Sequence, residues 1–122
     1  MRTRYYSKSK YKNKKTRIDG IKFDSLREAN RYVELKYKQK AGLISNLKLQ
    51  VPFKLQPEFT DSFKKKHRAI IYIADFWYLD IITNEAVIED CKGFKTAVYL
   101  LKKKMLLYSF RNLSNAPTFI ET

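Results

Sequence analysis

Two apolar segments joined by a short turn occupy the chain between Ala69 and Gly93, which reads AIIYIADFWYLDIITNEAVIEDCKG. Nearly every position in both segments is apolar or aromatic, as in strands buried inside a sheet. Charged residues interrupt this pattern, and those that first need an explanation are Asp75 in the first segment and Asp90 and Lys92 in the second. An ionised group inside such a strand is costly unless it is paired or binds a metal. These three residues are therefore the first candidates for a functional site.

The alternation of side chains along strands predicts which of these charges meet. A two-residue turn at positions 83–84 would set Asp75 opposite Lys92, with Asp90 on the same face. Any turn of even length keeps the three charges together, whereas an odd turn brings Asp75 towards Glu89 instead. On the first strand, the residues expected to share one face are Ala69, Ile71, Ile73, Asp75 and Trp77.

Two carboxylates and an ammonium group on one face suit a divalent metal site. Asp75 and Asp90 can hold Mg²⁺ or Mn²⁺ through oxygen ligands, with positions left for water and a phosphate oxygen. Such an ion promotes phosphodiester hydrolysis, and Lys92 can orient the attacking water or stabilise the transition state. The alternative is a buried salt-bridge network that only fixes strand register, although buried ion pairs contribute little net stability.

The charge of the chain favours a polyanionic partner. It has 122 residues with 26 Lys and Arg against 12 Asp and Glu, a net charge of +14, which favours nucleic acid. A solvated basic surface or a ribosome-associated structural protein is the alternative. We expect a basic arm over residues 1–16 and one folded domain over residues 17–122. The basic residues expected to contact DNA are Arg2, Arg4, Lys8, Lys10, Lys12, Lys14, Lys15, Lys64, Lys65, Lys66, Lys102 and Lys103.

Cysteine content and hydropathy restrict the location of the protein. The one cysteine, Cys91, excludes an internal disulfide and a cysteine metal cluster, and its side chain reads as a small buried apolar group. The basic N-terminal segment is not a signal peptide, and no apolar run approaches the roughly 20 residues that span a bilayer. We therefore expect a cytoplasmic protein without a membrane partner.

The N-terminal half predicts a hairpin followed by a helix. Asp19-Gly20 between isoleucines is a strong hairpin signal. A helix should begin after Ser25 and end near residue 41, before Gly42. Glu28 completes an S-x-x-E capping box with Ser25, but it also borders the apolar stripe of this helix. The residue can therefore cap the helix or point into the protein core.

The remaining elements complete an α/β (α+β) fold, a mixed sheet with a helix on each side. Residues 46–55 alternate as a half-buried strand, in which Pro52 indicates an edge position or a bulge. Gln50 on this strand is interpreted as solvated, with a place beside the carboxylates as the alternative. Residues 56–68 read as a polar loop, and residues 117–121 as a final edge strand. A second helix spans residues 96–110, capped by Thr96. Its apolar stripe consists of Ala97, Leu101, Met105 and Tyr108, extended by Leu100, Leu107 and Phe110.

The acidic residues also carry a resemblance to a known family. Asp75 followed by Asp90-Cys91-Lys92 resembles the D…(D/E)-x-K signature of the restriction-endonuclease-like nuclease superfamily. With DGIKFDSLREA, YIADFWY and VIEDCKG, residues 18–110 resemble small phage proteins related to phage endonuclease I and other Holliday junction resolvases. Two departures are Asp90, where many relatives have glutamate, and Ala74, where they have proline.

The resemblance implies a restriction-endonuclease-like core and a set of site residues. Glu28, Asp75 and Asp90 would be ligands to Mg²⁺ or Mn²⁺, together with the backbone carbonyl of Cys91, and Lys92 would be the water-orienting base or stabiliser. Glu89 is a substitute ligand if the strand register is shifted. The resemblance also implies a homodimer that cuts two strands symmetrically, in the host cytoplasm if the protein is phage-encoded.

The function expected from the sequence is a metal-dependent endonuclease acting on branched DNA such as Holliday junctions, in phage recombination or replication. Two alternatives stay open. One is a nuclease for another DNA structure, such as a flap, a nick or a duplex. The other is a non-catalytic nucleic-acid-binding protein in which the charged cluster is structural.

Overall fold

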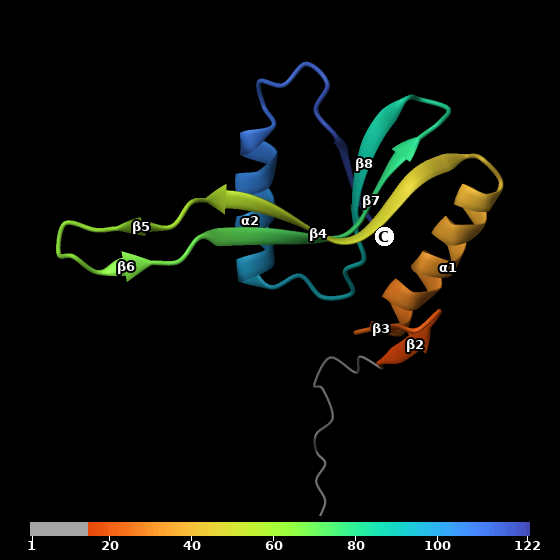
Figure 1. The fold of residues 1–122 in the computed structure, drawn as a ribbon, viewed down its shortest axis with the longest axis horizontal. Helices are drawn as coiled ribbons and strands as arrows, with labels where there is room; N and C mark the ends of the chain where they lie inside the picture. The colour runs from red at the N-terminus through yellow and green to blue at the C-terminus, as the bar shows by residue number, and fades with distance from the viewer. Residues whose placement is uncertain (1–14) are drawn as a thin grey trace, which may run out of the picture.

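A four-stranded mixed sheet forms the centre of the protein (Figure 1), whose computed structural model describes residues 15–122. The strand order is β4-β7-β8-β9. Strands β4, β7 and β8 are antiparallel, and β9 runs parallel to β8. The predicted mixed sheet and the two predicted edge strands are therefore confirmed. The strands are β4 (Ile44–Gln56), β7 (Ile70–Asp80), β8 (Glu85–Asp90) and β9 (Thr118–Glu121).

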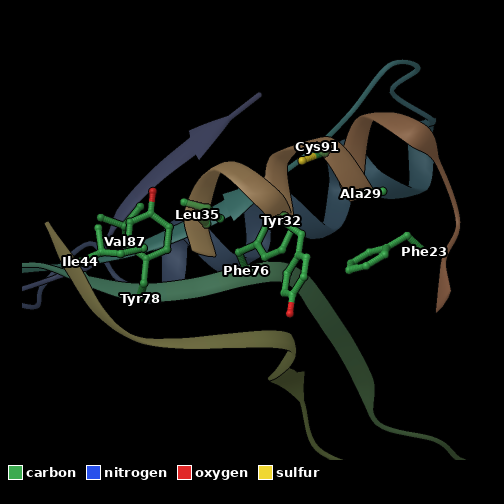
Figure 2. Close-up of a cluster of buried hydrophobic side chains, with 9 residues drawn as sticks. All are labelled: Phe23, Ala29, Tyr32, Leu35, Ile44, Phe76, Tyr78, Val87 and Cys91. Carbon is green, nitrogen blue, oxygen red and sulfur yellow. The ribbon is translucent and has the colours of Figure 1, made fainter. Parts of the chain in front are cut away.

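Two helices, α1 (Leu26–Lys40) and α2 (Ala97–Ser109), cover opposite faces of this sheet. Adjacent residues of β8 show the arrangement, because Val87 packs in the cluster beneath α1 and Ile88 in the cluster beneath α2. Successive strand residues point to opposite faces. Figure 2 shows the α1 cluster, in which Ala29, Tyr32 and Leu35 of the helix meet the aromatic residues of β7.

Ser25 and Gly42 mark the two ends of α1 as predicted, whereas the Glu28 carboxylate bonds Gln50 instead of closing the capping box. The Ser25 hydroxyl accepts a hydrogen bond from the Glu28 amide at 3.1 Å, which caps the first turn. Gly42 follows the helix with a φ of +79°, a conformation that favours glycine. Before the helix, β2 (Thr16–Ile18) and β3 (Ile21–Phe23) form the predicted hairpin, with Asp19-Gly20 as its two-residue turn. Both turn residues have positive φ, as a type I′ turn requires.

The side of α2 that packs on the sheet is not the one centred on the predicted apolar stripe, although Phe110 from its extension does pack there. Leu106 is the buried residue of this helix, and Tyr99 and Phe110 pack against the same cluster. Leu101 and Tyr108 of the predicted stripe are 59% and 63% exposed. The helix is apolar on more than one side, so periodicity alone does not identify the side that faces the sheet.

The turn between β7 and β8 has four residues, Ile81 to Asn84, rather than the predicted two. Asp80 pairs with Glu85, and the Asp80 carboxylate accepts hydrogen bonds from the amides of Ile82 and Thr83 at 2.9 and 3.2 Å. This local bonding favours the longer turn. Its length is even, so the faces of β8 relative to β7 remain as predicted.

The predicted polar loop at residues 56–68 contains a small hairpin instead. Strands β5 (Phe59–Thr60) and β6 (Lys66–His67) pair in an antiparallel manner. We call residues 57–69 the finger. It continues the β4–β7 ribbon and extends away from both helices (Figure 1).

A buried ionic network ties α1 to the sheet. Glu89 is fully buried, and both of its carboxylate oxygens accept hydrogen bonds from the Arg31 guanidinium. The hydroxyls of Tyr78 and Thr122 donate to the same carboxylate at 2.8 and 2.9 Å. Arg31 also binds the exposed Glu34. Its two ion pairs therefore allow the contribution of a buried pair to stability to be compared with that of an exposed pair.

Arg31→Ala should lower the free energy of unfolding by about 3–5 kcal/mol, since it leaves a buried carboxylate without its cation. Urea unfolding measures the change. Glu34→Ala removes only the exposed partner and should cost about 0.5 kcal/mol or less. A loss for Arg31→Ala as small as that of the control would contradict the structural importance of the pair.

Candidate active site

Asp75 and Asp90 lie where the backbone ladder between β7 and β8 ends. The last backbone pair on this side is Phe76 with Glu89. Beyond it, the Asp75 amide donates to Asp90 Oδ1 at 3.0 Å, and the Cys91 amide donates to Asp75 Oδ2 at 2.9 Å. Each carboxylate therefore accepts a backbone hydrogen bond from the neighbouring strand. The predicted proximity of the two aspartates is present, with both side chains at most 9% exposed.

Strand β7 changes phase at Asp75. Tyr72 and Ala74 pack in the α2 cluster, whereas Phe76 packs in the α1 cluster. A regular strand would place all three on one face. Ala74 and Trp77 both face α2. Ile73 precedes Ala74 and therefore lies on the opposite face of the strand from it. The prediction that Ile73 and Trp77 share a face is thus wrong.

The irregularity in β7 has a counterpart in β4. Gln50 has a φ of +52° between residues that pair with β7. Leu49 before it packs against the α1 cluster and Phe53 after it against the α2 cluster. The long ribbon thus changes sides at Gln50 and Asp75, a distortion of the kind that bulges produce beside active sites.

Gln50 is exposed, in keeping with its interpretation as a solvated residue, but it also connects Glu28 to Asp75, which is the alternative position beside the carboxylates. Its amide nitrogen donates to Glu28 Oε2 at 3.1 Å and to Asp75 Oδ1 at 3.4 Å. The Glu28 amide caps the helix through Ser25 while the Glu28 carboxylate reaches the sheet. Glu28 therefore serves the helix with its backbone and the charged cluster with its side chain.

Glu28, Asp75 and Lys92 line one cavity of about 540 Å³ between the start of α1 and the end of β8. Asp90 lies beneath it and is fully buried, and its Oδ2 atom has no hydrogen-bond partner. The other lining residues are Asp24, Ser25, Arg27, Cys91, Gly93, Phe94 and Thr96.

The ammonium group of Lys92 is positioned by an aromatic ring. Its Nζ lies 4.6 Å from the centroid of the Tyr99 ring, a favourable cation–π distance. The Tyr99 hydroxyl donates to Glu121 at 2.5 Å, and Glu121 also pairs with Lys95 and Lys103 at 3.1 Å each. Within residues 15–122, Lys92 forms no ion pair within 4.0 Å, so it acts on the carboxylates from a distance.

The carboxylates of the site hold their protons more tightly than usual. Burial, followed by the charges of Asp75 and Asp24, raises the pKa of Glu28 from an ordinary 4.5 to about 7. Burial also raises the pKa of Asp90 from 3.8 to about 6 and raises that of Asp75, although hydrogen bonding and Lys92 oppose both shifts. Burial is therefore the main cause of these raised pKa values, and a cation close to the carboxyl groups would favour their ionised form.

Glu89 and the Cys91 side chain lie on the other face of β8. Glu89 is held by Arg31 and Tyr78 in the α1 network, which separates it from the cavity and leaves it no role as a substitute ligand. The Cys91 thiol packs in the α1 cluster and contacts the Thr122 hydroxyl at 3.2 Å. Burial raises the pKa of this thiol to about 11, in keeping with its predicted apolar role.

The donor atoms of the cluster fit Mg²⁺ or Mn²⁺ in kind. In the described part of the chain, no group of three or more His, Cys, Asp and Glu side chains is arranged to hold a metal ion. The Gln50 amide group lies between Glu28 and Asp75. However, Mg²⁺ is commonly bound by one or two carboxylates while it keeps several waters. The Asp90 Oδ2 atom, which has no hydrogen-bond partner, and the carboxylate of Asp75 match that preference in kind.

The predicted DNA-contacting residues fall into three groups. Lys64, Lys65 and Lys66 are exposed on the finger, and Lys15 is exposed before β2. Lys102 and Lys103 are half-buried, and Lys103 is engaged with Glu121 rather than fully free for DNA. Arg2, Arg4, Lys8, Lys10, Lys12 and Lys14 lie outside the described residues.

Sequence reasoning placed Gln50 beside the carboxylates only as an alternative, and it missed the supporting residues Tyr99 and Glu121. Gln50 lies on the polar side of an alternating strand, so its pattern is that of a solvated residue. Tyr99 reads as one of several apolar positions of α2. A signal for Glu121 is its place as an acidic residue at the end of a β-prone segment, but its partners come from a distant helix.

Residues 8–119 match the family described as a protein of unknown function, DUF1064, and the chain belongs to this family. The matched range includes the four charged residues of the site, Glu28, Asp75, Asp90 and Lys92. No curated protein and no solved structure matches the chain. Neither helix in residues 15–122 is long and apolar enough to cross a membrane.

The raised pKa values predict how stability depends on pH. A carboxyl with a raised pKa binds its proton more tightly in the folded state, so stability falls as the pH rises through that window. For Glu28 the window runs from 4.5 to about 7. Wild type should lose free energy of unfolding across this window. Glu28→Gln should make that loss smaller by on the order of 1–2 kcal/mol, after allowance for solvent screening.

Urea unfolding at a series of pH values without divalent metal measures the effect. Glu58→Gln, on the exposed finger, is the matched control and should keep the wild-type profile. A Glu28→Gln profile as steep as that of wild type between pH 4.5 and 7 would show that Glu28 is not the group responsible.

Proposed function

We propose that this protein is a metal-dependent endodeoxyribonuclease with a restriction-endonuclease-like core, acting on branched DNA such as a four-way junction. The observation that carries the proposal is the convergence of Glu28, Asp75 and Lys92 on one cavity, with Asp90 beneath it. A helical glutamate, an aspartate and a D-x-K pair are the groups that the resemblance to junction resolvases implies. They come from α1, β7 and the end of β8.

The roles of the residues follow from their positions. Glu28, Asp75, Asp90 and the Cys91 carbonyl would hold Mg²⁺ or Mn²⁺, which supplies Lewis-acid chemistry for phosphodiester hydrolysis. Lys92, held over the Tyr99 ring, would orient the attacking water or stabilise the charge that develops on the phosphate. Gln50 keeps Glu28 and Asp75 together before the ion binds.

The net charge of +14 supports DNA as the partner. Contacts to the backbone and to the shape of the DNA, rather than to bases, would position the substrate. We also propose a homodimer in the cytoplasm, since the outer stripe of α2 presents Val98, Leu101 and Tyr108 at 59–63% exposure. Sedimentation velocity distinguishes this dimer from a monomer.

A non-catalytic nucleic-acid-binding protein is the second candidate. It is favoured by the Gln50 amide, which satisfies Glu28 and Asp75 without any ion. In that case, the cluster fixes the ribbon geometry and the basic surface binds DNA. Cleavage separates the two candidates.

Wild type should cleave a synthetic four-way junction in the presence of Mg²⁺ and leave a linear duplex largely intact. Asp75→Asn and Lys92→Ala should each reduce cleavage by roughly 100-fold or more, because they remove charge from the reacting site. Labelled junction and duplex on denaturing gels measure the rates, and binding without metal is measured in parallel.

Lys95→Ala is the matched control for Lys92→Ala. Lys95 lies three residues further along and pairs with Glu121 instead of facing the cavity carboxylates. Binding without cleavage of either DNA by wild type would contradict the enzyme. Cleavage by Asp75→Asn at the wild-type rate would show that the active site lies elsewhere.

A further inference from the structure

The finger carries an aromatic residue in an unusual place. Phe63 at its tip is 89% exposed, more than any other large apolar residue in the described chain. An exposed aromatic ring gains stability when it is covered, and nothing else in the finger covers this one. The site described above does not involve Phe63.

The tip is held in a defined shape. Asp61 Oδ1 accepts hydrogen bonds from the amides of Phe63 and Lys65 at 2.7 and 3.0 Å. Asp61 Oδ2 contacts His67 Nε2 at 2.8 Å, and the Asp61 amide donates to the Lys65 carbonyl at 2.9 Å. Lys64, with a φ of +66°, completes the turn. These bonds fix the backbone on both sides of Phe63.

The base of the finger is also ordered. Phe59 pairs with His67 across the hairpin, and their rings stack with centroids 4.7 Å apart at an angle of 15°. The hairpin continues the β4–β7 ribbon and projects away from the helices (Figure 1). The structure thus presents Phe63 at the end of a supported projection, at a distance from the protein core.

The charge around Phe63 identifies the class of partner. Lys64, Lys65, Lys66 and Arg68 follow it in sequence and are all exposed. Glu58 and Asp61 are the acidic residues of the finger, and Asp61 is occupied by His67 and the turn amides. An exposed ring beside several cations suits a nucleic acid, in which bases stack on aromatic side chains while phosphates meet lysine and arginine.

We propose that Phe63 stacks on an unpaired or unstacked base at the branch point of DNA, while the basic residues of the finger contact the flanking phosphates. The proposal rests on the proposed function and names the DNA feature that the protein reads. An intact duplex buries its base faces in the stack. A branch point exposes them or allows an apolar side chain to wedge between them.

Binding in the absence of divalent metal tests the proposal. Fluorescence anisotropy compares a labelled four-way junction with a linear duplex of the same sequence, for wild type, Phe63→Ala and Phe63→Trp. Phe63→Ala should weaken junction binding by roughly tenfold or more and leave duplex binding unchanged. Phe63→Trp, which keeps a stacking ring, should restore junction binding.

Ile82→Ala is the matched control, because Ile82 is also an apolar residue on an exposed turn, at 78% exposure, but lies between β7 and β8. It should bind both DNAs as wild type does. Equal junction binding by Phe63→Ala and Ile82→Ala would overturn the proposal, and so would an equal loss on junction and duplex.

The outcome is independent of catalysis. A selective loss of junction binding in Phe63→Ala supports the proposed stacking role of Phe63, even if wild type cleaves no DNA with Mg²⁺. The absence of cleavage would contradict only the proposed nuclease activity. Conversely, the Phe63→Ala variant could bind and cleave the junction as wild type does. That result would contradict the stacking role of Phe63 but not the proposed nuclease activity.

Discussion

Two carboxylates replace backbone carbonyls where the ladder between β7 and β8 ends, and the rest of the site depends on this exchange. Asp90 accepts the Asp75 amide, and Asp75 accepts the Cys91 amide. The strands stay together beyond their last backbone pair while their side chains converge. Because the ribbon also changes phase at Asp75 and Gln50, Glu28 from α1 can reach the same place. One backbone irregularity thus brings together groups from a helix and two strands that are distant in sequence.

The raised pKa values of the buried carboxyl groups suggest that a bound cation would stabilise their ionised form. Burial raises the pKa of Glu28 to about 7 and that of Asp90 to about 6, and Lys92 is held over the Tyr99 ring instead of forming an ion pair. By comparison, Glu89 on the opposite face has a complete set of partners, with Arg31, Tyr78 and Thr122. The carboxylate that serves structure is therefore fully bonded, whereas Asp90 beneath the cavity has one oxygen without a hydrogen-bond partner.

Much of the fold could be predicted because local signals were strong. Asp19-Gly20, Ser25, Gly42 and the alternation of β4 each have a direct chemical reason to act as they do. The faces of β8 relative to the paired part of β7 were also predictable, since they depend on whether the turn length is even, but the change in alternation at Asp75 was not. The turn length itself depended on side-chain bonds of Asp80. The docked face of α2 depended on which of several apolar sides meets the sheet. The bridge from Gln50 depended on a positive φ that alternation does not reveal. Local bonds of Asp80 decided the turn length, whereas tertiary contacts decided the docked face of α2 and the partners of Gln50.

The most direct test of the site is whether a divalent ion stabilises the protein through Asp75. Urea unfolding at neutral pH, with and without Mg²⁺ or Mn²⁺, measures the response. An ion at about 100 times its dissociation constant should stabilise wild type by about 2.7 kcal/mol. Asp75→Asn keeps an oxygen that can accept the Cys91 amide but loses the charge, so the variant should fold and show little response. Glu34→Gln, an exposed carboxyl of α1, should respond as wild type does. Equal stabilisation of wild type and Asp75→Asn, or none in wild type, would contradict the metal site.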